Sequence, residues 1–527
     1  MNNVQILDCT LRDGGYCNNW EFGFDNTKKI ISGLIESGIE IIECGFLTNK
    51  TVYNKNVTKY TTLEELAQII PEKREGKLFV AMMNYGEYNI EDLPDYDGSS
   101  IDGIRIAFHK KNCNEALKLC REIKKKGYLV FVQAMVSLNY TDEEFLAVIK
   151  NVNQFKPYAF YIVDSFGMMK GKDLTRLFYM IEHNLEKDIQ IGFHSHNNMQ
   201  LAYSNAQKLI TVQTNRSLII DSSVYGMGRG AGNLNTELFV EYLNDNAGKK
   251  YQLKPLLYII DEILNSFYQK SYWGYSLPNY ISAVHNAHPN YASYLSYKNT
   301  LTIEAMNEIF EMMDEEKKVS YDKQYIEDLY YKYMETGKIQ EEYMEELRKF
   351  LSDKKILLIA PGKSSVDEVE RIKEFVTKEE VVIISVNFEY SHIDIDYVFL
   401  SNLRRFHELP KESRTKCIVT SNIQASDVYL RTSYKKLLSE REVVRDNAGL
   451  MAIRFLADMN VDEIFLAGFD GYSHNEDENY GEQSMEIITK FALLDAMNVQ
   501  MRDELSELAK KVKVTFLTDP RWVRIDK

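Results

Sequence analysis

Two histidines and one aspartate stand at positions where they can bind a divalent metal ion together. His194 and His196 end an apolar run in the segment IGFHSHN, and residues i and i+2 of a strand point to the same face. Asp13 lies in LDCTLRDGG, just after the first apolar run. Two imidazoles and a carboxylate suit a divalent ion and leave positions open for a substrate. A lone His-x-His pair is more often packed or at the surface, so the interpretation needs all three residues.

Other polar residues stand close to these three in the predicted arrangement. Arg12 precedes Asp13 and offers a positive charge where negative charge develops in a reaction, although a structural ion pair is the alternative reading. Asn233, in GMGRGAGN, offers a carbonyl oxygen as a further metal ligand. Three more polar residues at the ends of apolar runs are interpreted first as supporting architecture of the site: Glu43, Gln133 and Asp164.

Eight short apolar runs, separated by helical patterns, must position these side chains. Each run is rich in Ile, Val, Phe or Tyr, which predicts strands. Eight β/α units within about 245 residues match the size of a closed parallel (β/α)8 TIM barrel. A doubly wound open sheet is the alternative, and the barrel is favoured because reactive residues gather after the C-terminal ends of the runs. The runs cover residues 4–10, 39–47, 78–84, 103–108, 129–136, 160–165, 189–194 and 218–223.

The rest of the chain predicts a helical segment and a second α/β domain. We expect a barrel over residues 1–245, a helical extension and charged linker over 246–350, and a Rossmann-like open α/β domain over 351–527. The fold class is therefore α/β throughout. The strands of the second domain are expected at 356–360, 381–386, 397–400, 417–420, 463–467 and 512–517.

Composition narrows the possible partners. The chain of 527 residues has a formal net charge of −15, with 45% hydrophobic and 27% charged residues. This acidic balance argues against nucleic acid or an anionic membrane surface as partner. No apolar stretch is long enough for a membrane span, no signal peptide is visible, and the six cysteines show no paired zinc spacing. We therefore expect a cytoplasmic protein, and we also expect a homo-oligomer.

The motifs LDCTLRDGG, HSH and GMGRGAGN, in this order, resemble a known superfamily. It comprises the metal-dependent lyases and synthases typified by hydroxymethylglutaryl-CoA lyase and isopropylmalate synthase. Within it, residues 1–300 most resemble 4-hydroxy-2-oxovalerate aldolase. The resemblance implies that Asp13, His194 and His196 are metal ligands and that Arg12 steadies an enolate oxygen. Asn233 matches a ligand of the CoA-dependent branches. The expected ion is Mn2+, with Mg2+ or Zn2+ as alternatives.

One position departs from the aldolase pattern. The aldolases have a histidine base shortly after the arginine–aspartate pair, whereas this chain reads GGYCNNW, with Tyr16, Cys17 and Asn18 in that neighbourhood. A water relay, His109 after the fourth run, or Tyr280 can take the proton role instead. Tyr280 lies in WGYSLPNY, which resembles the aldolase region that supplies a catalytic tyrosine, although a packed aromatic is the plainer reading.

The resemblance implies an aldolase-type lyase that makes or breaks a C–C bond of a 2-oxo acid, using a pyruvate enolate and an aldehyde. A 2-oxo acid can chelate a metal through its carboxylate and keto oxygens, and the ion then acts as a Lewis acid. An acyl-CoA-dependent Claisen-type synthase is one alternative. A non-catalytic sensor of 2-oxo acids is another.

The C-terminal segment suggests a nucleotide site. The motifs KILLIAPGKSS, ISVNF, DYVFLSN, CIVTSN and NAGLMAIRFLADMNVDEIFLAGFDGYS follow one another in this order. This series resembles the Rossmann-like domains of bacterial sialyltransferases and motility-accessory glycosyltransferases. The turn APGKSS can present backbone N–H groups to phosphate. We expect a nucleotide or nucleotide-linked sugar, cytidine compounds first, in a role in surface-glycan precursor synthesis. A glycosyl or nucleotidyl transferase carried by this domain, or a merely structural domain, are the alternatives. The expected binding residues are Gly362, Ser364, Asn387, Asn402, Ser421 and Asn422.

Overall fold

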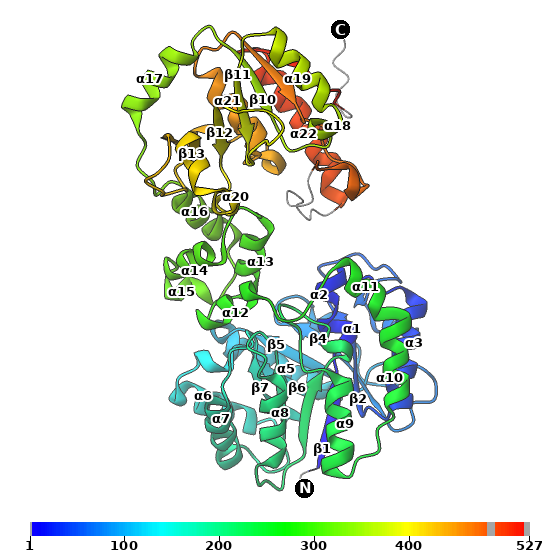
Figure 1. The fold of residues 1–527 in the computed structure, drawn as a ribbon. Coiled ribbons are helices and arrows are strands. Elements are labelled where there is room, and N and C mark those ends of the chain that lie inside the picture. Colours follow the sequence, from blue (N-terminus) through cyan, green and yellow to red (C-terminus); the bar gives the residue numbers. More distant parts are fainter. Residues whose placement is uncertain (1–2, 482–490, 521–527) are drawn as a thin grey trace. The chain divides into compact units, whose positions relative to one another are not determined.

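The computed structural model describes residues 3–481 and 491–520, and its N-terminal part is a closed barrel of eight parallel strands (Figure 1). β1 pairs in parallel with both β2 and β9, which closes the ring. A short further strand, β3 (Lys59–Tyr60), lies beside β2. The predicted barrel is therefore confirmed. Its strands are β1 (Val4–Asp8), β2 (Ile41–Leu47), β4 (Leu78–Asn84), β5 (Gly103–Phe108), β6 (Leu129–Ala134), β7 (Ala159–Asp164), β8 (Gln190–Ser195) and β9 (Leu218–Ser222).

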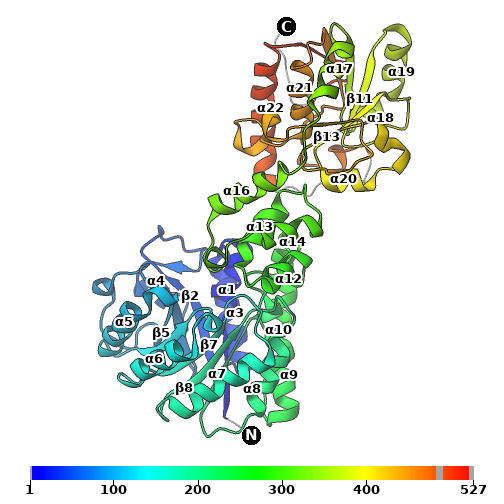
Figure 2. The same cartoon turned by 90° about the vertical axis from the view of Figure 1, so that its left-hand side faces the viewer.

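Amphipathic helices cover the outside of the barrel (Figure 2). In the helix over Cys113–Lys125 the buried residues Ala116, Leu117, Cys120 and Ile123 recur at helical spacing, so one face packs on the strands. The main helices around the barrel are α3 (Phe24–Ser37), α4 (Leu63–Ala67), α5 (Cys113–Lys125), α6 (Asp142–Asn153), α7 (Gly171–Asn184), α8 (Ala202–Thr211), α9 (Thr236–Ala247) and α10 (Leu253–Ile259).

The barrel interior is packed with side chains below the mouth. Leu7, Val80, Phe131 and Ile219 belong to one buried cluster contributed by different strands. Because all the strands are parallel, their C-terminal ends meet at one rim. Two short helices continue directly from β1 at that rim, α1 (Thr10–Asp13) and α2 (Gly15–Asn18). The fold therefore places Asp13 beside the ends of the neighbouring strands.

The helical segment after the barrel does not form a body of its own. One compact unit comprises Met1–Ser293 and Asp314–Tyr321, and the other comprises Tyr294–Met313 and Asp322–Lys527. The expected charged linker includes α16, where Tyr330 is fully buried within the second unit. The three-part division of the chain stays a prediction. The helices are α11 (Asn265–Lys270), α12 (Leu277–Val284), α13 (Pro289–Tyr297), α14 (Ile303–Glu311), α15 (Glu315–Lys318), α16 (Lys323–Met334) and α17 (Glu341–Leu351).

The second unit contains a seven-stranded sheet that is parallel throughout, as expected for an α/β domain. The strand order is β14, β13, β12, β11, β10, β15, β16. Figure 2 shows α21 and α22 on one side of this sheet and α19 on the other. Within the described residues, no helix is long and apolar enough to cross a membrane.

The strands of this sheet are β10 (Lys355–Ile359), β11 (Val382–Val386), β12 (Tyr397–Leu400), β13 (Cys417–Thr420), β14 (Leu430–Thr432), β15 (Glu463–Ala467) and β16 (Lys513–Phe516). Its helices are α18 (Ser364–Asp367), α19 (Val369–Lys378), α20 (Leu403–Glu408), α21 (Ala448–Ala457) and α22 (Phe491–Leu508).

Candidate active site

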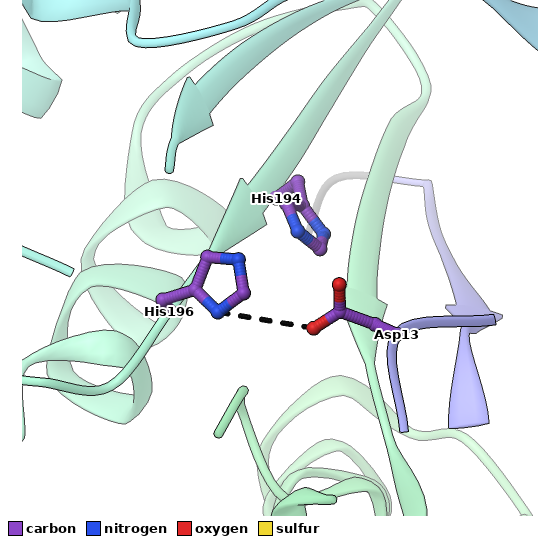
Figure 3. A group of neighbouring side chains, drawn as sticks. All are labelled: Asp13, His194 and His196. Carbon is purple, nitrogen blue, oxygen red and sulfur yellow. Dashed lines mark ion pairs between the residues drawn. The ribbon is translucent and has the colours of Figure 1, made fainter. Parts of the chain in front are cut away.

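Asp13, His194 and His196 come together at the C-terminal mouth of the barrel, as Figure 3 shows. All three are buried, and one ligand atom of each lies within 4.8 Å of the others. Nδ1 of His196 is 3.8 Å from Oδ2 of Asp13. The two imidazole rings stand nearly perpendicular, with centroids 5.2 Å apart. Two nitrogens and a carboxylate at this spacing form a possible site for one divalent ion.

Each histidine is also held by a second partner. Nδ1 of His194 lies 3.0 Å from Oδ2 of Asp221, and Nδ1 of His196 lies 3.2 Å from the carbonyl oxygen of Arg229. Such contacts fix the ring and leave Nε2 with a lone pair. Burial lowers the pKa of His196 to about 3 in spite of the neighbouring Asp13 carboxylate. The His196 ring is therefore neutral at pH 7, which a metal ligand requires.

Arg12 contacts the same carboxylate. Its NH1 lies 2.5 Å from Oδ1 of Asp13, and its Nε lies 2.9 Å from Oε2 of Glu43. Burial acts to raise the pKa of Asp13, but Arg12 and the two histidines outweigh burial and hold this pKa below its ordinary value. Asp13 is therefore an anion at neutral pH.

Asn233 lies next to Asp13 and is also buried. Its Nδ2 donates to Oδ2 of Asp13 at 2.7 Å, while its Oδ1 has no partner among the described residues. A buried amide oxygen without a partner is unfavourable unless a ligand completes it. Gly228 allows the close approach here, since a Cβ at this position would lie 2.3 Å from Nδ2 of Asn233 and 2.6 Å from Oδ2 of Asp13.

A chain of ion pairs supports the site from inside the barrel. Arg105 is fully buried; its NH1 lies 2.8 Å from Oε2 of Glu43, and its NH2 pairs with Asp221. These contacts form a continuous series of charged pairs from Arg12 through Glu43, Arg105 and Asp221 to His194. Sequence analysis identified Glu43 as supporting architecture but missed Arg105 and Asp221. The available signal was a single charged residue inside each of two apolar strands, GIRIAF and LIIDS.

A cavity of about 50 Å3 lies at the mouth above these residues. The sequence analysis also missed Arg229, which lies within the GMGRGAGN motif already used for Asn233. Residues that line the cavity include Arg12, Asp13, Tyr16, Asn84, Gln133, Ser165, His194, His196 and Arg229.

The two predicted proton carriers do not line this cavity. Tyr280 lies on α12 and is 41% exposed. His109 follows β5, and burial, together with the positive charges of Lys111 and Arg229, lowers its pKa. Asp164, at the end of β7, instead accepts hydrogen bonds from the backbone N–H groups of Met168 and Met169. Asp164 thus holds its loop in shape.

In the second unit, some of the predicted binding residues gather around one large cavity. This cavity of about 430 Å3 is lined by Gly362, Asn387 and Asn402, and all of its lining residues belong to this unit. Ser364, Ser421 and Asn422 do not line it. Ser421 is buried, with its Oγ donating to the carbonyl of Met334, and Asn422 donates to the carbonyl of Ser401.

The turn APGKSS contacts a carboxylate of the protein itself. The backbone N–H and the hydroxyl of Ser364 both donate to the buried Asp470. The donors that we expected to meet phosphate are thus already matched by an anion. A ligand phosphate in this cavity would need other donors.

Comparisons with known proteins find several that are similar to the barrel part of this chain. Residues 104–260 match the HMGL-like family. The 4-hydroxy-2-oxovalerate aldolase of Pseudoalteromonas translucida is 27% identical over 243 residues, 46% of this chain and 70% of the relative. The oxaloacetate decarboxylase of Mycobacterium tuberculosis is 26% identical over 242 residues, 45% of this chain and 69% of the relative.

One solved structure is also similar to part of this chain. The N-terminal domain of a candidate aldolase from Bacteroides vulgatus is 29% identical, with a TM-score of 0.47, and the match covers 56% of this chain and 97% of that one. The curated relatives and the matched family together support a carbon–carbon lyase of the HMGL-like kind.

Proposed function

We propose that the barrel is a divalent-metal-dependent lyase of the aldolase type that acts on a 2-oxo acid. The observation that carries this proposal is the buried cluster of Asp13, His194 and His196 at the mouth, with Arg12 in contact with it. The substrates named in two relatives, 4-hydroxy-2-oxovalerate and oxaloacetate, are both 2-oxo acids. Pyruvate is the enolate-forming fragment that we infer, with an aldehyde as its partner.

The donor set fits a metal ion, which Asp13, His194, His196 and Asn233 would hold. Oδ1 of Asn233, which has no partner among the described residues, supports this fit because it is an oxygen donor on a side chain that contacts Asp13. When bound, the ion supplies Lewis acidity toward the keto and carboxylate oxygens of the substrate. Two oxygen ligands favour the harder ions Mn2+ or Mg2+, and the imidazoles also tolerate Zn2+. We propose Mn2+.

Arg12 takes the role of stabilising negative charge. Two of its nitrogens are engaged by Asp13 and Glu43, while its buried NH2 has no partner among the described residues. This NH2 is the donor that we assign to the enolate oxygen. For the group that transfers the proton, we retain three candidates: His109, Tyr280 and a water relay. Because neither His109 nor Tyr280 lines the cavity, a water relay would have to link either side chain to the substrate.

Proton exchange on pyruvate tests this proposal without knowledge of the aldehyde. Full-length protein loaded with Mn2+ is expected to exchange the methyl protons of pyruvate in D2O, followed by NMR. The double variant His194→Ala, His196→Ala is expected to lose both the bound metal and the exchange, whereas the exposed His183→Ala serves as control. If the double variant kept its full metal content and its full rate of proton exchange, the assignment of His194 and His196 as metal ligands would be wrong. Turnover that requires an acyl-CoA would favour the Claisen-type synthase.

A second candidate function belongs to the other unit. The cavity of about 430 Å3 lies at the C-terminal ends of β10, β11, β12 and β15. In the sheet β10 lies between β11 and β15, so strand order reverses there, the place where open α/β sheets bind ligands. Asn387, Asn402 and Asn447 offer hydrogen bonds, and Lys298 and Arg405 offer positive charge. These features support a nucleotide or nucleotide-linked sugar.

Calorimetry of the full-length chain with CMP, UMP and GMP tests this second candidate. We expect cytidine nucleotides to bind below millimolar concentration and Arg405→Gln to weaken them. The exposed Arg502→Gln of the same unit is the matched control. If no nucleotide binds below millimolar concentration, the role in surface-glycan precursor synthesis fails as well.

A further inference from the structure

Three N–H donors that line the barrel cavity have no acceptor among the described residues. They are NH2 of Arg12, Nε2 of Gln133 and Nε of Arg229. The residues Arg12 and Gln133 are 6% and 2% exposed, so bulk water does not reach them freely. Buried donors are almost always matched by an acceptor. Three unmatched donors around one small cavity therefore indicate a ligand rich in oxygen acceptors.

The charges around the cavity point to an anionic ligand. Asp13 is the one acidic residue in its lining, and Asp13 is already paired with Arg12. Arg229 forms no ion pair within the part of the chain that the structure describes. Its guanidinium lies 5.4 Å from the centre of the Tyr16 ring, and its NH2 donates to the carbonyl of Ser165 at 3.1 Å. Arg229 therefore brings an uncompensated positive charge to the mouth.

Gln133 approaches the cavity from the side of the barrel opposite to Arg12, whereas Arg229 follows β9, the neighbour of β1. Arg12 follows β1, whereas Gln133 is the penultimate residue of β6 and Ser165 follows β7. Around the ring, β9, β8 and β7 separate β1 from β6. The side chain of Arg229 reaches toward the β7 side through its bond to Ser165. Arg12, Gln133 and Arg229 thus line one cavity, and Gln133 comes from the side of the ring opposite to Arg12.

We propose that Gln133 and Arg229 bind a second carboxylate of the substrate, so that the substrate is a 2-oxo acid with an anionic group at the far end of its chain. This inference rests on the proposed lyase function. A planar carboxylate matches the fork of a guanidinium whose Nε is open.

The backbone of Arg229 has a separate role, which makes a side-chain substitution informative. The carbonyl oxygen of Arg229 lies 3.2 Å from Nδ1 of His196. Gly230 follows with a positive φ of 67° and fixes the loop. A change of the Arg229 side chain keeps this backbone contact, so the metal content of the variant checks that the loop is intact.

Binding of two matched acids tests the proposal directly. Calorimetry of the full-length, Mn2+-loaded protein would compare 2-oxoglutarate with 2-oxopentanoate, which differ only in the terminal carboxylate. We expect the dicarboxylate to bind at least about tenfold more tightly, as a charge-assisted hydrogen bond allows. Arg229→Gln is expected to remove this preference, Arg229→Lys to keep part of it, and Gln133→Glu to reverse it by repulsion.

Matched controls separate the possible outcomes. Arg121→Gln, on α5 and away from the cavity lining, should keep the full preference. Equal binding of the two acids by the unaltered protein, or a full preference in Arg229→Gln, would overturn the proposal. Stronger binding of 3-phosphonopyruvate than of oxaloacetate would overturn the choice of a carboxylate. If the protein prefers 2-oxoglutarate to 2-oxopentanoate but does not exchange the methyl protons of pyruvate, only the lyase function is refuted. If it exchanges these protons but binds the two acids equally, only the second anion site is refuted.

Discussion

Arg12 contributes more than a charge to the candidate site. Its guanidinium contacts Asp13 with one nitrogen and Glu43 with another, and the third nitrogen has no partner among the described residues. A lysine ammonium keeps the charge but lacks the planar fork that serves three acceptors in fixed directions. An Arg12→Lys substitution therefore keeps the positive charge and removes only the planar shape of the guanidinium.

We expect Arg12→Lys to lower kcat by about 10²–10³, the usual loss for one donor to a developing oxyanion. The metal ligands stay in place, so metal content should not change. Steady-state kinetics and metal analysis of the purified variant measure both quantities. Turnover equal to that of the unaltered protein would show that Arg12 is structural.

Asp8 gives the barrel a pH-dependent stability. It ends β1, is buried, and accepts hydrogen bonds from the Thr10 N–H and the Thr236 hydroxyl. Burial raises its pKa from 3.8 to about 6, although these hydrogen bonds act to lower it. Between pH 4 and 6 the folded state therefore keeps a proton that the unfolded state has released. Stability falls as pH rises through this window and levels off above it.

Asp8→Asn removes this titration and should flatten the dependence. Between pH 4 and 6, the unfolding free energy of the unaltered protein should fall by roughly 2–3 kcal/mol relative to that of Asp8→Asn. Urea unfolding at a series of pH values, followed by tryptophan fluorescence, measures it. The exposed Asp25→Asn, in the first turn of α3, is the control. Identical pH profiles for Asp8→Asn and the unaltered protein would contradict the assignment.

The candidate ligands could be predicted because each lies in a short local motif at a strand end. Their supporting partners could not. Asp221 lies 27 residues from His194, on the neighbouring strand β9, whereas Arg105 lies 116 residues from Asp221 and meets it across the interior of the closed ring. Charge inside an apolar strand was visible in the sequence, but its partner depends on which strands become neighbours.

At the scale of elements, the barrel depends on the ion pairs inside it. Arg105 is surrounded by the carboxylates of Glu43 and Asp221 and lies over the Tyr161 ring at 5.1 Å. Removal of one partner from a buried ion pair typically costs about 3–5 kcal/mol, because a charge remains uncompensated. The strands β2, β5 and β9 are thereby linked across the interior.

We therefore expect Arg105→Met to lower the unfolding free energy of the barrel by about 3–5 kcal/mol, measured by urea unfolding. Arg121→Met, on α5, should change it by no more than about 0.5 kcal/mol. Equal stability of Arg105→Met and the unaltered protein would show that the carboxylates are satisfied without the arginine.

The strands themselves were well predicted, since each buried parallel strand is a short apolar run. The predicted and observed ends of the strands differ by at most two residues. The run predicted at 129–136, for example, corresponds to β6 at Leu129–Ala134. β14 was missed because Leu430–Thr432 is only three residues long and contains Arg431. The helical segment was expected as a linker because its surface is charged, yet Leu347 and Leu351 of α17 are fully buried.

For the whole molecule, the two cavities belong to separate compact units. Every residue that lines the larger cavity lies in the second unit, and every metal ligand candidate lies in the first. We therefore expect no coupling free energy between the two sites. Removal of the metal by a chelator should change the affinity for a nucleotide by no more than about twofold. Calorimetry before and after chelation measures this. A large loss of nucleotide affinity would reveal coupling between the units.

The register of the first strand has a consequence for how the protein is made. Val4 pairs with Leu218, so the ring stays open until β9 has left the ribosome. Asp13 is synthesised early, while His194 and His196 come about 180 residues later. Contacts between such distant residues form late in folding because a long loop must close first. Uptake of a metal ion by nascent chains of increasing length would therefore report when the barrel becomes complete.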